Sequence, residues 1–396
     1  MSLPVYLDYA ATTPVDPRVA EAMQTCLTMD GAFANPASRS HIYGWQAEER
    51  VEQARCELAE LIGAESRELV WTSGATESNN LALKGLMEGA ASRGRHIVTS
   101  RIEHKAVLDV CEYLRRHHHC EVSYIEPEKD GRLVIADFER ALRDDTALVS
   151  LMHVNNELGV INDIGTLGKL CRERGIVFHV DAAQSVGKLP IDVKALAVDL
   201  LSISGHKFYG PKGVGALYVR RSGSVTIAPQ IHGGGHERGL RSGTLATHQL
   251  VGIGVAASIA KAEMQAEQKR LAGLKQRFLA GLKELQAIGI NGSVQHSIAG
   301  IVNIHFAHVE GEALVLALRD IAISTGSACT SLTVEPSYVL SAMGLEAQLA
   351  HSSIRFSFGR FTTEQDVDRA LSCVVETVNR LRSQSASWSA YVAAGR

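Results

Sequence analysis

The sequence has 396 residues, enough for two or three domains and a large buried core. Its 40 Lys and Arg residues against 43 Asp and Glu residues give a formal net charge of −3, so no strong field favours nucleic acid or a membrane surface. Hydrophobic residues make up 45% and charged residues 21%, proportions that exclude a disordered or fibrous chain and favour small-molecule chemistry.

Short apolar runs alternate with amphipathic stretches between about residues 65 and 220, a pattern typical of strand–helix–strand units. The helices expected there include Ala47–Leu61, Asn79–Ala90 and Thr166–Arg174. The expected strands are Leu69–Thr72, His96–Ser100, Val122–Ile125, Ala147–Leu151, Val177–Val180, Leu200–Ser204 and Gly215–Val219. We therefore predict an α/β fold with a mainly parallel, seven-stranded sheet.

The later part of the chain has a different pattern. Ala, Gln, Lys and Glu dominate over about residues 255–287, which predicts one long helix. A strand near Ile301–Phe306, a helix at Gly311–Arg319, a strand at Ile354–Phe358 and a helix from Glu364 to about Leu381 follow. We expect a large domain at residues 16–262 and a smaller α+β domain built from residues 1–15 and 263–396.

Seven cysteines stand at positions 26, 56, 111, 120, 171, 329 and 373, without a C-x-x-C motif or the spacing of a zinc site. This odd, unpaired set favours the reducing cytoplasm over a disulfide-stabilised extracellular protein. Residues 1–11 lack the basic and apolar segments of a targeting peptide, so none is expected. The longest apolar run, Leu250–Ala260, is too short to span a bilayer, so we expect no membrane association.

A first candidate site is the segment Ser73–Glu77, which lies between an expected strand and an expected helix. A glycine turn at this place directs backbone N–H groups and a hydroxyl toward an anion such as a phosphate. The same residues also suit an ordinary capped helix start, in which a hydroxyl satisfies unpaired backbone N–H groups. Taken alone, the segment favours the capped helix start.

Asp181 follows one expected strand, and Lys207 follows the next. Because open α/β sheets bind ligands at the carboxyl ends of their strands, the two side chains can meet opposite ends of one planar ligand. Pyridoxal phosphate needs a lysine for its Schiff base, an acid at its ring nitrogen and a phosphate site, to which Ser204 and His206 add donors. Taken alone, a lysine here would be interpreted as an exposed loop residue, but its neighbours favour the cofactor.

Cys329 lies in a loop of small residues, Ser324–Ser331, where no bulky side chain would bury its thiol. It is therefore the candidate reactive cysteine, although a harmless loop cysteine fits the same pattern. The other six cysteines lie in amphipathic patterns and are interpreted as small core residues. Arg355 lies in an apolar strand pattern, where an arginine is either paired structurally or presented to a carboxylate such as that of an amino acid.

The arrangement of these motifs closely resembles the cysteine desulfurases, in the IscS-like branch of the class V pyridoxal-phosphate aminotransferase family (IscS/NifS group). The resemblance runs from Tyr6 to about Thr363. Its blocks include residues 6–8, 11–14, 35–38, 73–77, 103–104, 155–157, 181–184, 204–207, 241–244 and 327–331 in the family's order. It implies a fold-type I pyridoxal-phosphate transferase.

The resemblance implies specific roles for the matching residues. Lys207 would hold pyridoxal 5'-phosphate as a Schiff base, and Asp181, Gln184, Asn155 and His104 would contact its ring. The phosphate would be held by Ala75, Thr76, Ser204, Gly205, His206 and, from the other subunit of a homodimer, Thr244. Arg355 and Asn35 would bind the substrate carboxylate. Lys207, His104 and Cys329 would be the catalytic residues.

The implied reaction removes sulfur from L-cysteine, giving L-alanine and a persulfide on Cys329. The freed amine of Lys207 moves the α-proton, and the Cys329 thiolate attacks the substrate sulfur. The implied acceptors are an iron–sulfur cluster scaffold protein and the sulfur carriers of tRNA thiolation. Cys329 would also be a transient ligand of a 2Fe–2S cluster shared with the scaffold.

Three alternatives remain at this point. The first is another class V pyridoxal-phosphate lyase, such as a selenocysteine lyase, since only pocket details separate selenium from sulfur. The second is a sulfur-delivery platform that uses the fold only to bind partners and carries no cofactor. The third, a nucleotide-binding protein, is disfavoured because the sequence has neither G-x-G-x-x-G nor G-x-x-x-x-G-K-[ST] at a suitable turn.

Overall fold

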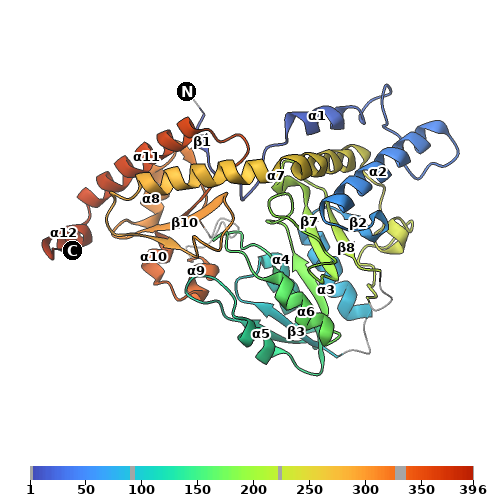
Figure 1. The fold of residues 1–396 in the computed structure, drawn as a ribbon, viewed down its shortest axis with the longest axis horizontal. Helices are drawn as coiled ribbons and strands as arrows, with labels where there is room; N and C mark the ends of the chain where they lie inside the picture. The colour runs from blue at the N-terminus through green and yellow to red at the C-terminus, as the bar shows by residue number, and fades with distance from the viewer. Residues whose placement is uncertain (1–2, 90–93, 222–224, 326–335, 396) are drawn as a thin grey trace.

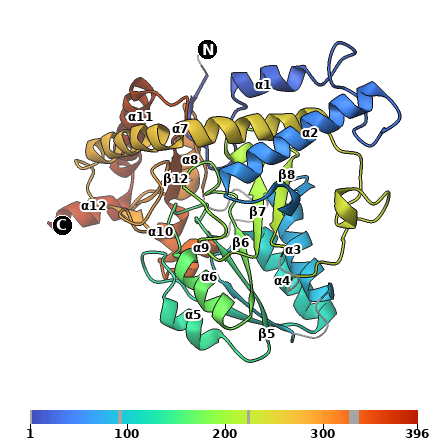
Figure 2. The same ribbon diagram turned by 45° about the vertical axis from the view of Figure 1, so that its right-hand side comes forward.

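The structure is a computed structural model that describes residues 3–89, 94–221, 225–325 and 336–395. Its larger sheet has the strand order β2-β8-β7-β6-β5-β3-β4. These strands are β2 (Leu69–Thr72), β3 (His96–Ser100), β4 (Glu121–Ile125), β5 (Thr146–Met152), β6 (Val177–Asp181), β7 (Leu200–Ser204) and β8 (Gly215–Val219). Strands β8, β7, β6 and β5 are labelled in Figure 2. Neighbours from β4 to β7 pair in parallel, whereas β8 is antiparallel to β7 and β2. The predicted mainly parallel, seven-stranded sheet is confirmed.

Helices cover both faces of this sheet, which explains why its strands are continuous apolar runs. One face packs against α2 (Ile42–Leu61), α5 (Ile135–Ala141), α6 (Ile164–Glu173) and the first half of α7 (Thr247–Gly281). The other face packs against α3 (Ala75–Gly89) and α4 (Lys105–His118). Successive residues of β2 separate accordingly, since Val70 joins the core under α3 and Trp71 the core under α2.

A second core lies at the other end of α7, which crosses from one to the other (Figure 1). Its sheet has the order β12-β10-β9, from Ser353–Ser357, Ile301–Phe306 and Ile288–Asn291, all antiparallel. The remaining pair, β1 (Val5–Tyr6) with β11 (Ile321–Ala322), is parallel. Helices α8 (Gly311–Ala317) and α11 (Glu364–Ser383) complete this part. The domain limits at residues 16 and 262 stay a prediction.

The shorter elements connect these layers. They are α1 (Pro17–Gln24), η1 (Ser66–Glu68), η2 (Gly205–Lys207), η3 (Glu237–Gly239), α9 (Tyr338–Ala342), α10 (Ala347–His351) and α12 (Ala386–Ala393). None of the described helices is long and apolar enough to cross a membrane.

The long helix starts earlier than the expected residue 255. Its first half is buried on several sides, so it lacks the amphipathic pattern that marked the second half. Two glycines there allow close packing: a Cβ added at Gly252 would lie 2.8 Å from Met23 Cγ, and one at Gly254 would lie 2.6 Å from Ala54 Cα. Glycine is unfavourable inside a helix, so these two residues obscure the start of the helix in the sequence. In the structure they allow the neighbouring helices to approach closely.

The cysteine interpretation also needs correction. Cys26, Cys111, Cys120 and Cys171 are buried, as expected of small core residues. Cys373 is half-buried, and Cys56 is exposed on the outer face of α2, so Cys56 is not a core residue. Cys329 lies outside the described residues.

A buried ion pair ties α2 to the segment before α7. Arg55 donates from both terminal nitrogens to Glu237, at 2.7 and 2.9 Å, and both side chains are at most 4% exposed. Glu237 also accepts from the backbone N–H of Trp71 at 2.8 Å, which secures strand β2. Removing one partner leaves the other charge buried without compensation.

We therefore expect Arg55→Leu to lower the free energy of unfolding by about 3–5 kcal/mol. Arg39→Leu, which removes an exposed pair with Glu48, should cost about 1 kcal/mol or less. Urea denaturation under one set of conditions measures both. Equal small losses in the two variants would contradict the importance of the buried pair.

Burial also makes stability depend on pH through His179, which lies in β6 between Ser150 Oγ at 2.8 Å and Ser202 Oγ at 2.9 Å. Burial lowers the pKa of His179 to about 4 from its usual 6.5. Between these values the unfolded chain binds a proton that the folded protein does not. Stability is therefore lost as the pH falls, by roughly 3 kcal/mol from this residue.

We expect His179→Asn to reduce the slope of the unfolding free energy against pH between pH 6.5 and 4. The reduction should correspond to at most one proton taken up on unfolding. The exposed His351, at the end of α10, provides the control variant His351→Asn. Urea denaturation at several pH values gives the slopes. An unchanged slope in His179→Asn would show that this histidine is not the titrating group.

Candidate active site

A cavity of about 620 Å³ opens where the carboxyl ends of β5, β6 and β7 face the smaller sheet. It lies at the sheet edge where open α/β folds bind ligands. The structure brings nine of the predicted site residues to its walls: Ala75, Thr76, His104, Asp181, Gln184, Ser204, His206, Lys207 and Arg355. Elements far apart in the sequence therefore meet at one site.

Lys207 enters the cavity directly after β7, at the end of the short helix η2. Its Nζ donates hydrogen bonds to the backbone oxygens of Ala10 and Ala11, both at 2.8 Å. Gly205 begins this turn and does not line the cavity; a Cβ there would lie 3.0 Å from the oxygen of Pro211. The glycine thus lets the backbone bend sharply enough to bring the amine back to the sheet edge.

Asp181 is the last residue of β6, and its carboxylate is held from two sides. Asn79 Nδ2 of α3 donates to Oδ2 at 2.8 Å, and the backbone N–H of Ala183 donates to Oδ1 at 3.0 Å. Both bonds orient the carboxylate, which is nearly buried but still reaches the cavity. Asn79 was missed in the sequence, although an asparagine on the buried face of an otherwise apolar helix was a usable signal.

His104 caps the start of α4 and lines the cavity. Its Nδ1 accepts from the backbone N–H of Ala106 at 3.1 Å, which leaves Nε2 as the nitrogen that carries the proton in the neutral ring. Burial lowers the pKa of His104, with Asp181 acting in the opposite direction. The ring is therefore neutral at pH 7.

The predicted anion site lines the same cavity. Gly74, at φ +148°, turns the chain from β2 into α3, where the first N–H groups have no acceptor within the helix. Ser204 and His206 line the cavity too, and a Cβ added at Gly74 would lie 3.7 Å from Ser204 Oγ. Burial and, after it, the nearby charges of Lys207, Lys212 and Lys188 together lower the pKa of His206 to about 4, so this imidazole is a neutral partner at pH 7.

Arg355 reaches the cavity from β12 of the smaller sheet. It donates from Nη2 to Asp8 Oδ1 at 2.9 Å and from Nη1 to the backbone oxygen of Asn156 at 2.8 Å. Its Nε is buried and has no partner among the described residues. The arginine is thus both structurally paired and left with a donor that suits a carboxylate ligand.

Four predicted residues do not line the cavity within the described structure, and they are Asn35, Asn155, Gly205 and Thr244. Asn35 and Thr244 are exposed. The Asn155 side chain is fully buried, where its Oδ1 accepts from the backbone of Glu157 and Leu158 at 2.9 Å.

Sequence reasoning also missed several cavity residues. Asn156, rather than Asn155, lines the cavity, and its buried Oδ1 has no partner in the described part of the chain. Asp8, Lys212, Ser324 and Thr325 line it as well. Asp8 and Asn156 fall within the motif blocks that carry the family resemblance. The sequence therefore singled out both residues, but it did not show that they line the cavity.

The donor set suits pyridoxal phosphate. A lysine amine, a buried carboxylate and the start of a 15-residue helix lie around one cavity, matching the reactive, nitrogen and phosphate ends of that molecule. Asn79 Oδ1 and Asn156 Oδ1 add buried acceptors without partners among the described residues. No group of three or more His, Cys, Asp or Glu side chains that could hold a metal occurs in the described residues.

Comparison with known proteins agrees with this assignment. A family model described as Aminotransferase class-V matches residues 5–370. A protein named cysteine desulfurase IscS from Aeromonas hydrophila subsp. hydrophila is 60% identical, covering 99% of this chain and 96% of that protein. The chain belongs to the class-V aminotransferase family, as an enzyme of the IscS/NifS type. IscS of Shewanella sp. strain MR-4 is 59% identical with the same coverage.

Solved structures give the same result. A NifS-like protein superposes with a TM-score of 0.89 at 36% identity, over 96% of this chain and 100% of that one. A structure described as SspA in complex with cysteine has a TM-score of 0.80 at 39% identity, over 90% and 99%. The predicted fold-type I architecture is confirmed, and pyridoxal phosphate is the cofactor of this enzyme family.

The bond from Asn79 to Asp181 generates a prediction. Asn79→Leu removes a donor to a buried carboxylate, so the apoprotein should bind pyridoxal phosphate roughly tenfold more weakly. Asn80→Ala is the matched control, because among the described residues Asn80 Nδ2 bonds the backbone oxygen of Thr76, at 2.9 Å, and not Asp181. Titration of apoprotein fluorescence measures both affinities. Unchanged affinity in Asn79→Leu would argue against Asp181 as a cofactor contact.

Proposed function

We propose that this protein is a cysteine desulfurase, which converts L-cysteine to L-alanine and stores the sulfur as a persulfide on Cys329. One observation carries the proposal: Lys207 and Asp181 line the same cavity as Arg355 and the N-terminus of helix α3, which suits a phosphate. The chain in which they do so is 60% identical to a protein named cysteine desulfurase IscS. When bound, pyridoxal phosphate accepts the electrons released at the substrate's α-carbon.

The residues of the cavity divide the work of the reaction. Arg355 lines the cavity and binds the substrate carboxylate, which places the α-carbon within the pocket. The amine of Lys207 takes the α-proton and returns it. Neutral His104 presents its Nε2–H toward the reacting groups, where it can exchange a proton. Asn35 is an additional carboxylate contact in this proposal.

Cys329 is the proposed nucleophile. Its thiolate forms a bond to the substrate sulfur while the carbon–sulfur bond breaks, so the sulfur passes to the enzyme as a persulfide and the carbon, after protonation, becomes alanine. The residues before it, Ser324 and Thr325, line the cavity. Cys329 is four residues beyond Thr325, and four residues span at most about 14 Å.

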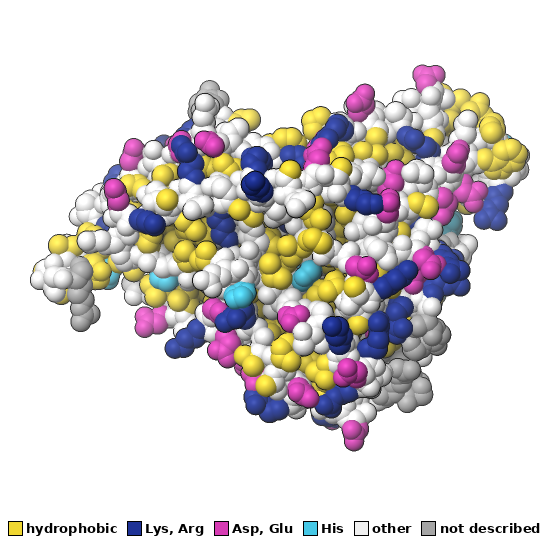
Figure 3. Space-filling view, in the orientation of Figure 1, with side chains coloured by type: hydrophobic (Ala, Val, Ile, Leu, Met, Phe, Trp, Pro, Cys, Tyr) yellow, Lys and Arg dark blue, Asp and Glu magenta, His cyan; other side chains and the backbone are white. Residues whose placement is uncertain are grey.

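We also infer a homodimer. Exposed apolar side chains gather at the end of the molecule where α1 leads into α2, visible as a yellow patch at the upper right of Figure 3. They are Leu27, Met29, Phe33, Ile42, Tyr43 and Trp45, between 41% and 69% exposed. Patches of this kind commonly mark protein interfaces. Thr244 is exposed too, as required if it contacts the phosphate of the other subunit.

The sulfur acceptors in this proposal are an iron–sulfur scaffold protein and the sulfur carriers of tRNA thiolation, with Cys329 as a transient 2Fe–2S ligand at the scaffold. The proposed location is the cytoplasm, because a persulfide-forming thiol needs a reducing compartment. The six cysteines in the described residues are all free. Direct binding to nucleic acid or membrane is not part of the proposal.

Two variants test the function. Cys329→Ala should keep the visible absorption of bound pyridoxal phosphate but lose alanine and persulfide formation from L-cysteine, because the sulfur has no acceptor. Lys207→Ala should lose the covalently held cofactor. Cys56→Ala, which removes an exposed cysteine on α2, is the matched control and should retain full activity. Alanine and persulfide assays, together with absorption spectra, give the readouts.

The outcomes separate the alternatives. Full sulfur release by Cys329→Ala would overturn the nucleophile assignment. Alanine formation from L-selenocysteine alone would favour a selenocysteine lyase. A colourless wild-type protein that gains no absorption on addition of pyridoxal phosphate would favour a sulfur-delivery platform.

A further inference from the structure

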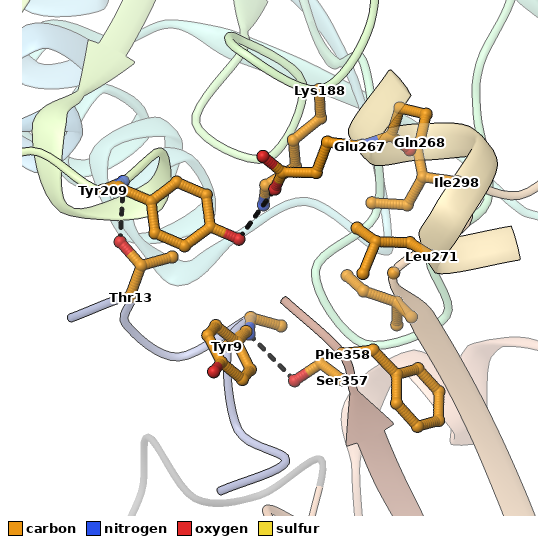
Figure 4. A pocket seen from close by; sticks show the side chains of 13 residues that line it. Tyr9, Thr13, Lys188, Tyr209, Glu267, Gln268, Leu271, Ile298, Ser357 and Phe358 are labelled. Carbon is orange, nitrogen blue, oxygen red and sulfur yellow. Dashed lines mark hydrogen bonds between the residues drawn. The ribbon is translucent and has the colours of Figure 1, made fainter. Parts of the chain in front are cut away.

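Lys188 lies behind the wall of the active-site cavity, in the turn that follows β6. It lines a small second cavity of about 20 Å³ between the two cores, together with Tyr9, Tyr209 and Glu267 (Figure 4). Ala10 lines both cavities, so the wall between them is thin at this point. Lys188 can therefore affect residues of the active-site cavity without lining that cavity itself.

A chain of hydrogen bonds runs through this wall. Lys188 Nζ donates to Gln184 Oε1 at 2.7 Å, and Gln184 Nε2 donates to the backbone oxygen of Ala10 at 2.8 Å. Lys207 Nζ donates to the same Ala10 oxygen at 2.8 Å. The amide of Gln184 and the reactive amine therefore meet at one acceptor.

The ammonium group of a lysine can only donate, and this restricts the amide of Gln184. Its oxygen must face Lys188, so its NH₂ group must face Ala10 and the cavity, where one hydrogen occupies Ala10 and a second is available. Without Lys188 the amide could rotate by half a turn and present its oxygen instead. The lysine thereby decides whether Gln184 offers the cavity a donor or an acceptor.

The orientation matters because of the chemistry of the cofactor. In pyridoxal phosphate the ring hydroxyl is on the carbon adjacent to the one that carries the aldehyde, and the aldehyde is the group with which a lysine amine reacts. A protein group beside Lys207 therefore also lies near that hydroxyl. A donor there stabilises the ionised hydroxyl, whereas an acceptor stabilises the protonated one.

We propose that Lys188 is a positioning residue that orients the amide of Gln184, so that Gln184 donates a hydrogen bond to the ring hydroxyl of pyridoxal phosphate. The proposal rests on the proposed function only in taking pyridoxal phosphate as the ligand. Lys188 itself touches neither cofactor nor substrate in this arrangement.

The surroundings of Lys188 set the conditions of the test. Glu267 of α7 is the nearby acid, and it is engaged by Tyr209 Oη and Arg360 Nε, both at 2.9 Å. Burial, together with the charges of Lys207 and Arg355 and against the opposing charge of Glu267, lowers the pKa of Lys188 to about 7. Measurements at pH 6.5 therefore keep the side chain mainly as the donor-only ammonium.

Lys188→Met removes the donor at similar length, and Lys194→Met, an exposed lysine of the same connecting segment, is the control. At pH 6.5 we expect Lys188→Met to bind pyridoxal phosphate about tenfold more weakly and to shift part of its visible absorption to the near ultraviolet. Lys188→Arg, which keeps donors, should restore the wild-type spectrum. Circular dichroism verifies that each variant is folded.

A second background separates positioning from charge. If Lys188 acts through the amide, adding Lys188→Met to Gln184→Leu should change affinity and spectrum by less than twofold. A full tenfold loss in that background, or a wild-type spectrum in Lys188→Met alone, would overturn the role of Lys188. A wild-type protein that binds no pyridoxal phosphate would instead overturn the proposed function, and this role with it.

Discussion

The parallel pairing of β6 with β7 is the constraint on which the site depends. Because the two strands run side by side in the same direction, Asp181 at the end of one and the turn to Lys207 at the end of the other reach the same sheet edge. Helices bury both faces of these strands, so their register is strongly fixed. The spacing between acid and amine follows from the fold itself and needs no flexible loop.

Residues 8–11 join this edge to the smaller sheet. The Asp8 carboxylate accepts from Arg355, whereas the oxygens of Ala10 and Ala11 accept from Lys207. The backbone N–H of Ala10 is in turn held by Ser357 Oγ of β12 at 2.9 Å. Arg355 and Lys207 are thus positioned by one short segment, so a displacement of this segment would disturb both.

Sequence patterns were sufficient to predict the features that depend on hydrophobic periodicity and on where strands end. The apolar runs located all seven strands of the large sheet, and the strand ends located Asp181 and Lys207. Contacts between distant segments were not predictable, because no local pattern links Lys207 to Ala10, 197 positions away. The role of Lys188 was hidden for the same reason, since its effect depends on where Gln184 points. Asn155 was taken from the family resemblance, whereas the structure places its neighbour Asn156 on the cavity wall, since adjacent residues in a turn face different ways.

The polar groups of the cavity fall into two sets with different consequences. Asp181, Gln184 and Lys207 are held by protein partners and are therefore preorganised. Arg355 Nε, Asn79 Oδ1 and Asn156 Oδ1 are buried without partners among the described residues, and each such atom costs about 1–3 kcal/mol. Because these atoms are closed to solvent, a ligand in the cavity reaches them only if side chains rearrange, whereas the groups held by protein partners are oriented before a ligand arrives.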